Sequence, residues 1–244
     1  MELIPGLSDW AIAGAICGAA AGTAWGAVAP SSQAFGATIR RAPDKGKIAL
    51  TFDDGPNPGV TPELMELLEM HGARGTFFLI GRFAREARTL AREIHERGHA
   101  LGNHTETHPS LVFLAPGKIR EELERCDAAI EDATGERPRW MRPPYGFRSP
   151  FLGGMVEARR QKVVMWSRMA RDWAPQPAEG VIERLRRARG GDIVLLHDGD
   201  HRVLRGDRGH TVKALEYWLP RWKEAGLKFV TLDEFGQDGK PSAA

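Results

Sequence analysis

The sequence predicts an α/β fold built on parallel β-strands, and two observations carry this prediction. Short apolar strand signals alternate with helical signals over most of the chain, and strands separated by helices pair in parallel through crossovers. Polar residues that could take part in catalysis or metal binding follow the strands, at the edge where parallel α/β folds place their active sites. The alternation fits either an open doubly wound sheet or a (β/α) barrel, and no internal repeat or second-domain linker interrupts it.

Each expected element has its own local signal. Lys47–Phe52 is a short β-type run, and Thr61-Pro62-Glu63 provides an N-cap, a first-turn proline and an acidic first turn for a helix that ends near Gly72. Thr76–Ile80 is the next strand, followed by a helix from about Arg82 to Arg97. Further strands are expected at His99–Asn103, Trp140–Arg142, Val163–Trp166, Ile193–Leu196 and Phe229–Leu232, and further helices at Ile119–Ala133 and Val181–Arg189.

Composition limits the class of protein. The chain has 244 residues of which 42% are hydrophobic, which is enough for a substantial core. Lys and Arg total 34 against 32 Asp and Glu, so the formal charge of +2 gives no reason to expect nucleic-acid binding. Cys17 and Cys126 are far apart and lack the paired spacing of a zinc ribbon or a redox motif.

The N-terminal segment is expected to be a hydrophobic helix that anchors the chain in a membrane. Ala11–Ala29 contains no charged residue and has about the length that crosses a hydrocarbon core. A cleaved signal peptide is the alternative, because Ala27-Val28-Ala29 resembles a cleavage site, although Glu2 and Asp9 are acidic where such signals begin with positive charge. Small residues recur on one face and would allow self-association of the anchor in lipid; they are Gly14, Gly18, Gly22 and Gly26.

The expected organisation is an anchor or signal segment at residues 1–30, a linker at 31–46, one domain at 47–235 and a tail at 236–244. Arg40, Arg41 and Lys45 follow the hydrophobic segment, and nothing basic precedes it. The positive-inside rule by itself would therefore place the domain in the cytoplasm.

Two adjacent carboxylates end the first predicted strand. Because successive side chains of a strand point to opposite faces, one of Asp53 and Asp54 can face a metal ion while the other faces a reacting water. The Gly55-Pro56 pair that follows stops the strand. On its own, such an Asp pair is more typical of a turn.

Two histidines follow the third predicted strand at a spacing of four. His104 and His108 can converge on one cation, and zinc accepts neutral imidazole readily. Alone, this spacing is common by chance, so the pair becomes informative only with a third ligand from another strand end. Asp54 is that ligand, and two His with one Asp leave an open coordination position, as catalytic sites do. Non-haem iron oxygenases use the same ligand set.

Three more strand ends carry polar groups. Arg142 and Tyr145 follow one strand, Asp172-Trp173 follows another, and His197 ends a run of apolar residues. A histidine in that position is, in isolation, more typical of a satisfied core residue. Five of the seven expected strand ends thus present Asp, His or Arg, which a purely structural explanation would have to treat as coincidence.

These motifs, in this order, resemble those of the polysaccharide deacetylase family, the NodB-homology domain of carbohydrate esterases, over Lys47 to Phe235. The matching stretches are Thr51-Phe52-Asp53-Asp54-Gly55-Pro56, His104-Thr105-x-x-His108, Arg142-Pro143-Pro144-Tyr145, Asp172-Trp173 and Leu195-Leu196-His197. The resemblance implies a distorted (β/α)7 barrel and metal-dependent removal of acetyl groups from glycans, usually from N-acetylated amino sugars.

The resemblance also implies a role for each residue. Asp53 would be the general base and His197 the general acid, while Arg142 would hold Asp53 and Asp172 would tune His197. The metal ligands would be Asp54, His104 and His108. The backbone N–H of Tyr145 would stabilise the oxyanion. Four aromatic residues could stack against sugar rings, although tryptophans also pack in barrels; they are Trp140, Tyr145, Trp166 and Trp173. Arg168 and Arg171 crowd Asp172 in a way that departs from the family pattern, and His201 and His210 are expected to be solvated.

The expected function is hydrolysis of acetyl groups from a cell-wall or related polysaccharide. The expected metal is zinc, with cobalt or another transition metal as the alternative. An O-acetyl esterase of the same fold, a non-haem iron oxygenase and a non-catalytic glycan-binding module are the competing functions. Because cell-wall glycans lie outside the cytoplasm, the domain is expected on the outer side of the membrane despite the basic residues after the anchor, with secretion as the alternative.

Overall fold

The structure is a computed structural model that describes residues 22–235. Most of the expected anchor and the whole expected tail, at residues 236–244, lie outside the described residues. Residues 22–28 are helical. Within residues 22–235, none of the helices combines the length and the apolar character that a membrane span requires.

The fold is built on one curled sheet in which every strand pairing is parallel. The strand order is β1-β6-β5-β4-β3-β2-β8-β7. The remaining strand, β9, is not part of this order and pairs with β2. The strands are β1 (Thr38–Ile39), β2 (Lys47–Gly55), β3 (Gly75–Leu79), β4 (Ala100–Asn103), β5 (Trp140–Met141), β6 (Lys162–Val164), β7 (Arg168–Met169), β8 (Ile193–His197) and β9 (Lys228–Phe229). The expected α/β fold with parallel strands is therefore confirmed.

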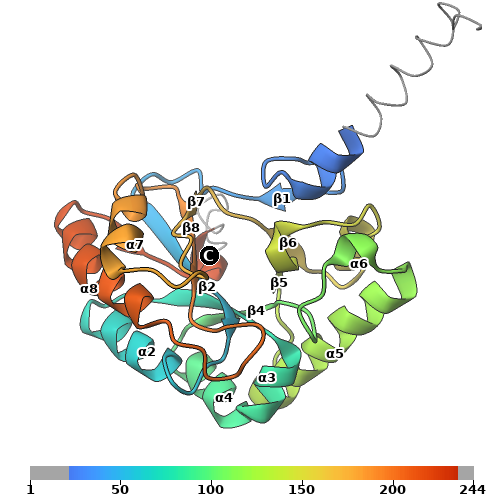
Figure 1. Ribbon diagram of the computed structural model, residues 1–244, viewed down its shortest axis with the longest axis horizontal. Helices are drawn as coiled ribbons and strands as arrows, with labels where there is room; N and C mark the ends of the chain where they lie inside the picture. The colour runs from blue at the N-terminus through green and yellow to red at the C-terminus, as the bar shows by residue number, and fades with distance from the viewer. Residues whose placement is uncertain (1–21, 236–244) are drawn as a thin grey trace, which may run out of the picture.

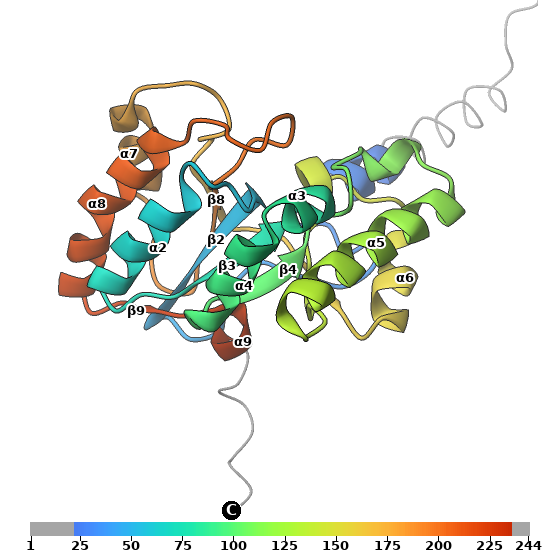
Figure 2. The same cartoon turned by 90° about the horizontal axis from the view of Figure 1, so that it is seen from below.

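Helices cover the outside of the curl, so the sheet and its helices form a half-barrel (Figures 1 and 2). They are α2 (Thr61–Met70), α3 (Gly81–Glu86), α4 (Arg88–Glu96), α5 (Pro116–Thr134), α6 (Leu152–Ala158), α7 (Ala178–Leu185), α8 (Gly209–Glu224) and the short α9 (Leu232–Phe235), with 3-10 turns η1 (Leu111–Phe113) and η2 (Pro144–Gly146). In the described part of the chain, β1 and β7 are the two ends of the strand path.

The central strand β2 alternates between two surroundings. Leu50 and Phe52 pack with leucines of α2 and α8 in the core between the sheet and the helices. Ala49 packs instead with residues of β3, β5 and β6 inside the curl. Because side chains alternate across a strand, Thr51 and Asp53 follow Ala49 onto the inner face. The apolar pattern of β2 thus determines that Asp53 lies inside the half-barrel, at the carboxyl end of the strand.

The opening between β6 and β8 is bridged by the chain that precedes β2. β1 pairs with β6, and Arg41 forms an antiparallel bridge with Asp192, just before β8. The backbone N–H of Ala42 donates to the carbonyl of Gly191 at 2.9 Å, and the Arg41 guanidinium lies 2.8 Å from the buried carboxylate of Asp192. Residues 31–46, which we expected to form a linker, therefore include a strand and belong to the packed domain.

Several elements differ from the sequence prediction. The helix expected over Arg82–Arg97 is two helices, α3 and α4, separated at Ala87 (φ −111°, ψ 46°), and both pack against α5. The last strand is short because Leu232 begins α9. After β6 the chain crosses to β8, where the N–H of Ser167 donates to the carbonyl of Ile193 at 3.0 Å. The next residues form β7, which is too short and polar to give a strand signal.

Candidate active site

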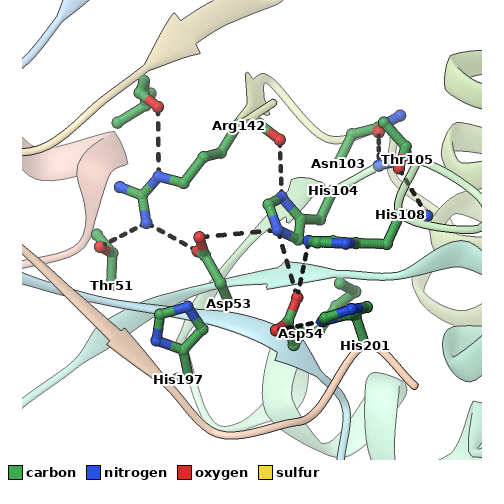
Figure 3. Close-up of polar contacts among 12 residues, drawn as sticks. Thr51, Asp53, Asp54, Asn103, His104, Thr105, His108, Arg142, His197 and His201 are labelled. Carbon is green, nitrogen blue, oxygen red and sulfur yellow. Dashed lines mark hydrogen bonds and ion pairs between the residues drawn. The ribbon is translucent and has the colours of Figure 1, made fainter. Parts of the chain in front are cut away.

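Residues from the carboxyl ends of the strands and the loops after them line one cavity of about 680 Å³. This is the edge at which parallel α/β folds place their active sites. Among the lining residues are the acidic, imidazole and aromatic side chains that the sequence analysis singled out: Asp53, Asp54, His104, His108, Tyr145, Trp173 and His197. Figure 3 shows His104 and His108 directed at the Asp54 carboxylate, and Arg142 between Thr51 and Asp53.

Asp54, His104 and His108 form a candidate metal site. Their ligand atoms all lie within 4.8 Å of one another, and all three residues are buried. The Oδ1 atom of Asp54 lies 3.2 Å from Nε2 of His108 and 3.5 Å from Nε2 of His104. This oxygen is buried and has no hydrogen-bond partner among the described residues, an arrangement that is costly unless a cation satisfies it. The three side chains therefore fit a divalent metal ion.

A β-bulge explains how two neighbouring aspartates face different groups. The register between β2 and β3 shifts between Asp53 and Gly55, and Asp54 has a φ of 73°. A bulge redirects a side chain at a strand end, so Asp53 stays on the inner face while Asp54 faces the two imidazoles. Gly199 lets the chain after β8 approach this bulge, because a Cβ there would lie 2.0 Å from the carbonyl oxygen of Asp54.

The two imidazoles are held and tuned differently. The Nδ1 atom of His104 shares a hydrogen bond with the carbonyl of Arg142 at 2.7 Å, which directs Nε2 toward Asp54. Burial opposes the charged form of His104, but the carboxylates of Asp53 and Asp54 outweigh it and raise its pKa. Burial, together with the charge of His104, lowers the pKa of His108 to about 3. His108 is therefore neutral at ordinary pH, which is the form that binds metals.

The carboxylate of Asp54 remains ionised. Burial opposes its charge, but contacts with the imidazoles of His104 and His201 hold its pKa well below the usual range. The metal-binding charge of this residue is thus present throughout the neutral pH range.

Asp53 is held by a buried arginine. The Nη1 atom of Arg142 donates to Asp53 Oδ1 at 2.8 Å and to Thr51 Oγ1 at 2.8 Å. Arg142 is fully buried, and its guanidinium lies over the ring of Phe78 at 4.2 Å. The second oxygen of Asp53, Oδ2, lies 3.8 Å from Nε2 of His104. Arg142 thus fixes one oxygen of Asp53 and leaves the other facing the metal triad.

His197 is paired with Asp172. Nδ1 of His197 lies 2.9 Å from Oδ1 of Asp172, while Oδ2 accepts hydrogen bonds from the backbone N–H of His197 at 2.7 Å and the hydroxyl of Thr211 at 2.8 Å. Burial opposes the charged imidazole, but the Asp172 carboxylate outweighs it and raises the pKa of His197 to about 9. The pair therefore keeps His197 protonated at neutral pH, with Nε2 left for the cavity.

Comparison with known proteins decides the family. The family model described as polysaccharide deacetylase matches residues 40–153. A chitooligosaccharide deacetylase from Azorhizobium caulinodans is 38% identical over 206 residues, covering 81% of this chain and 98% of that protein. The chain belongs to the polysaccharide deacetylase family. A peptidoglycan-N-acetylglucosamine deacetylase from Bacillus cereus is 37% identical over 198 residues, covering 77% of this chain and 86% of that protein.

Solved structures of polysaccharide deacetylases share the fold. A peptidoglycan N-acetylglucosamine deacetylase superposes with a TM-score of 0.77 at 30% identity, over 82% of this chain and 93% of that one. A CE4 family pseudoenzyme from Bacillus anthracis gives a TM-score of 0.73 at 30% identity, over 82% of this chain and 68% of that one. Because a pseudoenzyme shares the fold, turnover has to be inferred from the site residues and not from the fold.

The remaining expected residues of this polysaccharide deacetylase lie as follows. Tyr145 and Trp173 are partly exposed in the cavity. The ring centroid of Tyr145 lies 4.6 Å from that of His108, and the ring centroid of Trp173 lies 5.6 Å from that of His197. Arg168 does not crowd Asp172, since its Nε pairs with Asp192 at 3.2 Å. The departure from the family pattern therefore leaves the contact between Asp172 and His197 intact.

Two further tryptophans differ in position. Trp140 is buried, and its indole N–H donates to Asp233 at 2.8 Å, so it packs in the half-barrel. Trp166 is also largely buried, but it forms part of the cavity lining. Of the two, only Trp166 is placed where a substrate can reach it.

His201 and His210, which we expected to be solvated, are partly exposed, and each also makes a specific contact with a site residue. The ring of His201 stacks on that of His108 at 4.4 Å, and its Nδ1 lies 3.8 Å from Oδ2 of Asp54. His210 makes a hydrogen bond with the carbonyl of Asp172 at 2.7 Å. The spacing of four between His197 and His201, equal to that between His104 and His108, was the available signal.

Proposed function

We propose that the chain is a metal-dependent N-deacetylase of polymers that contain N-acetylglucosamine, such as peptidoglycan or chitooligosaccharides. The names of the relatives support this substrate class. The observation that carries the proposal is the content of one cavity. It holds a candidate metal triad, the oxygen of Asp53 that Arg142 does not bind, and the protonated imidazole of His197. A glycan-binding module would need neither of the last two groups. The half-barrel with its bridged opening supports the finer proposal of a distorted (β/α)7 barrel.

Zinc is the metal that we propose for Asp54, His104 and His108. Two imidazoles and one carboxylate with an open position form a typical catalytic zinc site, and cobalt or another transition metal is the alternative. When bound, the ion would supply an activated water and polarise the acyl oxygen of the substrate. Iron oxygenases share this ligand set, but the positions of Asp53 and His197 favour hydrolysis.

Asp53 is proposed as the general base. Arg142 occupies its Oδ1, so Oδ2 is the oxygen left to accept the proton of the attacking water. The guanidinium of Arg142 also gives this buried carboxylate an oppositely charged partner, without which its burial would be costly. Arg142 is then a positioning residue, which acts through Asp53.

His197 is proposed as the general acid. An amine is a poor leaving group unless it is protonated as the C–N bond breaks, and a histidine whose pKa is about 9 carries that proton at neutral pH. Nε2 of His197 gives the proton to the departing nitrogen, and Asp172 stabilises the charged imidazole until then. This supply of a proton favours N-acetyl over O-acetyl substrates.

Tyr145 and Trp173 are proposed to position the substrate. Tyr145 has a φ of 58° within the turn η2 and lies at the cavity, which supports its backbone N–H as a donor to the developing oxyanion. Trp173 lies edge-on to His197 with part of its ring exposed, where a sugar ring can stack on it.

We further propose that the uncharged N-terminal segment anchors the chain in a membrane with the domain on the outer side, where cell-wall glycans lie. The span would lie before Gly26, because residues 26–29 of the expected anchor at 11–29 bond to Arg148 of the domain. The uncharged sequence of this segment supports the anchor, and its repeated glycines support self-association. Membrane fractionation of producing cells, followed by protease treatment of intact cells, tests this. Protection of the domain from the added protease would refute the outward orientation.

The decisive experiment is acetate release by the full chain after metal removal and reconstitution with zinc. The panel contains chitooligosaccharides, N-acetylated peptidoglycan and an O-acetylated xylan. We expect acetate from the N-acetylated substrates, and no turnover by an Asp53→Asn variant that still binds one metal ion. Acetate from xylan alone would indicate an O-acetyl esterase. A metal-loaded chain that releases acetate from none of them would refute the proposal.

A further inference from the structure

The cavity of the candidate active site has a wall that comes from the N-terminal end of the described chain. Val28 and Pro30 line the same cavity as Asp53 and His197. Val28 is about half exposed, at 49%, so its methyl groups are available to a ligand. Both residues precede the part of the chain that matches the family model, residues 40–153. This wall therefore lies outside the stretch that the family model matches.

A buried arginine holds this wall in place. Arg148 is only 1% exposed, and its guanidinium donates to the carbonyls of Ser32 at 2.6 Å, Gly26 at 3.0 Å and also Ala29. Its backbone N–H donates to the carbonyl of Ala27 at 2.9 Å. The carbonyls at a helix end lack partners within the helix and carry partial negative charge, and residues 22–28 are helical. Arg148 thus caps this helix end with a positive charge.

Arg148 also fixes the side of the cavity on which the wall lies. It follows Tyr145 and Gly146 in one short loop, and both of these residues line the cavity. Val28 is therefore held on the side of the cavity that Tyr145 and Gly146 line.

A second attachment lies just after the wall. A Cβ on Gly36 would be 2.9 Å from the Cα of Gly153, and a Cβ on Gly153 would be 2.7 Å from the carbonyl oxygen of Phe35. Such close backbone approach requires glycine on both sides. Ser32, between the two attachments, is fully buried. Residues 26–36 are thus packed as part of the domain.

We propose that Val28 and Pro30 form a substrate-contact wall, held by Arg148, for the sugar unit next to the one that loses its acetyl group. The proposal rests on the proposed function, and the ligand class is a β-linked N-acetylglucosamine oligomer. A small apolar wall suits the C–H face of a pyranose ring.

The same contacts imply that the segment is retained in the working enzyme. Cleavage after Ala29, the site that resembles a signal-peptidase sequence, would remove the carbonyls of Gly26 and Ala29 from Arg148. Arg148 would then keep Ser32 alone among these partners, and Val28 would be lost from the cavity. The proposal therefore requires that residues 26–30 remain attached.

The test compares three variants of the full chain, Val28→Ala, Val28→Asp and the control Trp25→Ala. Trp25 is an exposed side chain, 55%, on the same helix, and it does not line the cavity. Binding of the N-acetylglucosamine monomer and hexamer to the metal-free chain is measured by calorimetry, and acetate release is measured on the zinc-loaded chain. Val28→Ala removes two methyl groups and should weaken hexamer binding about 3- to 5-fold. Val28→Asp should weaken hexamer binding by about 10-fold or more.

We expect the monomer, which cannot fill the reacting position and the next one together, to be less affected than the hexamer, and the Trp25→Ala variant to match the wild type in both assays. Equal hexamer affinity for Val28→Asp and wild type would overturn the proposal, even if the wild type releases acetate as proposed. A chain that discriminates the hexamer from the monomer without releasing acetate would refute the proposed function and leave the wall supported. Mass spectrometry of the chain from producing cells gives an independent result, since an N-terminus at Pro30 would overturn the proposal.

Discussion

Replacement of Asp172 by Asn tests how the site keeps a proton on His197. Asp172 contacts His197 twice, through Nδ1 at 2.9 Å and the backbone N–H at 2.7 Å, and it is fully buried. Asn keeps the shape of the side chain but removes the negative charge and replaces one of the two acceptor oxygens with an NH2 group. The variant therefore removes the charge and one acceptor while the packing volume stays nearly the same.

The expected magnitude follows from the pKa of His197. The pKa is raised from 6.5 to about 9, which corresponds to about 3 kcal/mol in favour of the protonated form. Because the pKa is raised on folding, this stabilisation is complete below pH 6.5 and is lost as the pH rises through about 9. If the variant returns the pKa to its ordinary value, the protonated fraction at pH 8 falls by about 30-fold.

The assay is the pH dependence of kcat/KM for acetate release from a soluble chitooligosaccharide, between pH 5.5 and 10, at constant metal loading. We expect the alkaline limb near pH 9 in the wild type and at least one unit lower in Asp172→Asn. A Thr211→Val control removes one hydrogen bond to Asp172 and keeps the charge, so its limb should move little. An unchanged limb in an active Asp172→Asn variant would show that His197 is not the acid, or that Asp172 does not tune it.

Three other perturbations give distinct outcomes. Arg142→Met leaves the carboxylate of Asp53 buried without its cation. We therefore expect turnover to fall and the free energy of unfolding, measured with urea, to decrease by about 3–5 kcal/mol. Unchanged stability would contradict the buried ion pair. Metal chelation should lower the melting temperature, because Oδ1 of Asp54 loses its cation. Zinc at about 100 times its Kd should restore about 2.7 kcal/mol of the free energy of unfolding. A melting temperature that does not change with zinc would count against the site. Burial raises the pKa of Asp198 to about 7 despite its hydrogen bond with Thr61. The folded state therefore favours the protonated carboxyl of Asp198. The ionised carboxylate destabilises the fold increasingly as the pH rises from about 4 to above 7. In the metal-free chain, Asp198→Asn should therefore raise the melting temperature more at pH 8 than at pH 5, and equal shifts at the two pH values would refute this reasoning.

The sequence predicted the elements that have strong periodic signals and the site residues that follow them. Asp53 and Asp54 could be assigned to different partners from strand alternation alone, although the observed cause includes a bulge whose φ of 73° no sequence pattern gives. β1 and β7 each have two residues and depend on pairing with distant strands. Unlike the equally short β5 and β9, they contain no aromatic residue, so they carry no local signal. They were missed for that reason.

The side chains that sequence reasoning missed depend on contacts far apart in the chain. Arg148 binds backbone carbonyls more than 110 residues away, and a carbonyl acceptor leaves no mark in the sequence. His201 was expected in solvent because its neighbours are polar, yet its ring stacks on His108. Tertiary packing determined both positions, and local composition did not.

The bridged opening of the half-barrel has a practical consequence for protein engineering. The chain reaches β1 from the rim of the catalytic cavity, so a purification tag or fusion partner joined near residue 28 would crowd the substrate. α9 lies instead by the start of β3, where the N–H of Leu232 donates to the hydroxyl of Thr76 at 3.0 Å, at the end of the sheet away from the cavity (Figure 2). Fluorophores, surface-immobilisation handles and carrier domains therefore belong after Phe235.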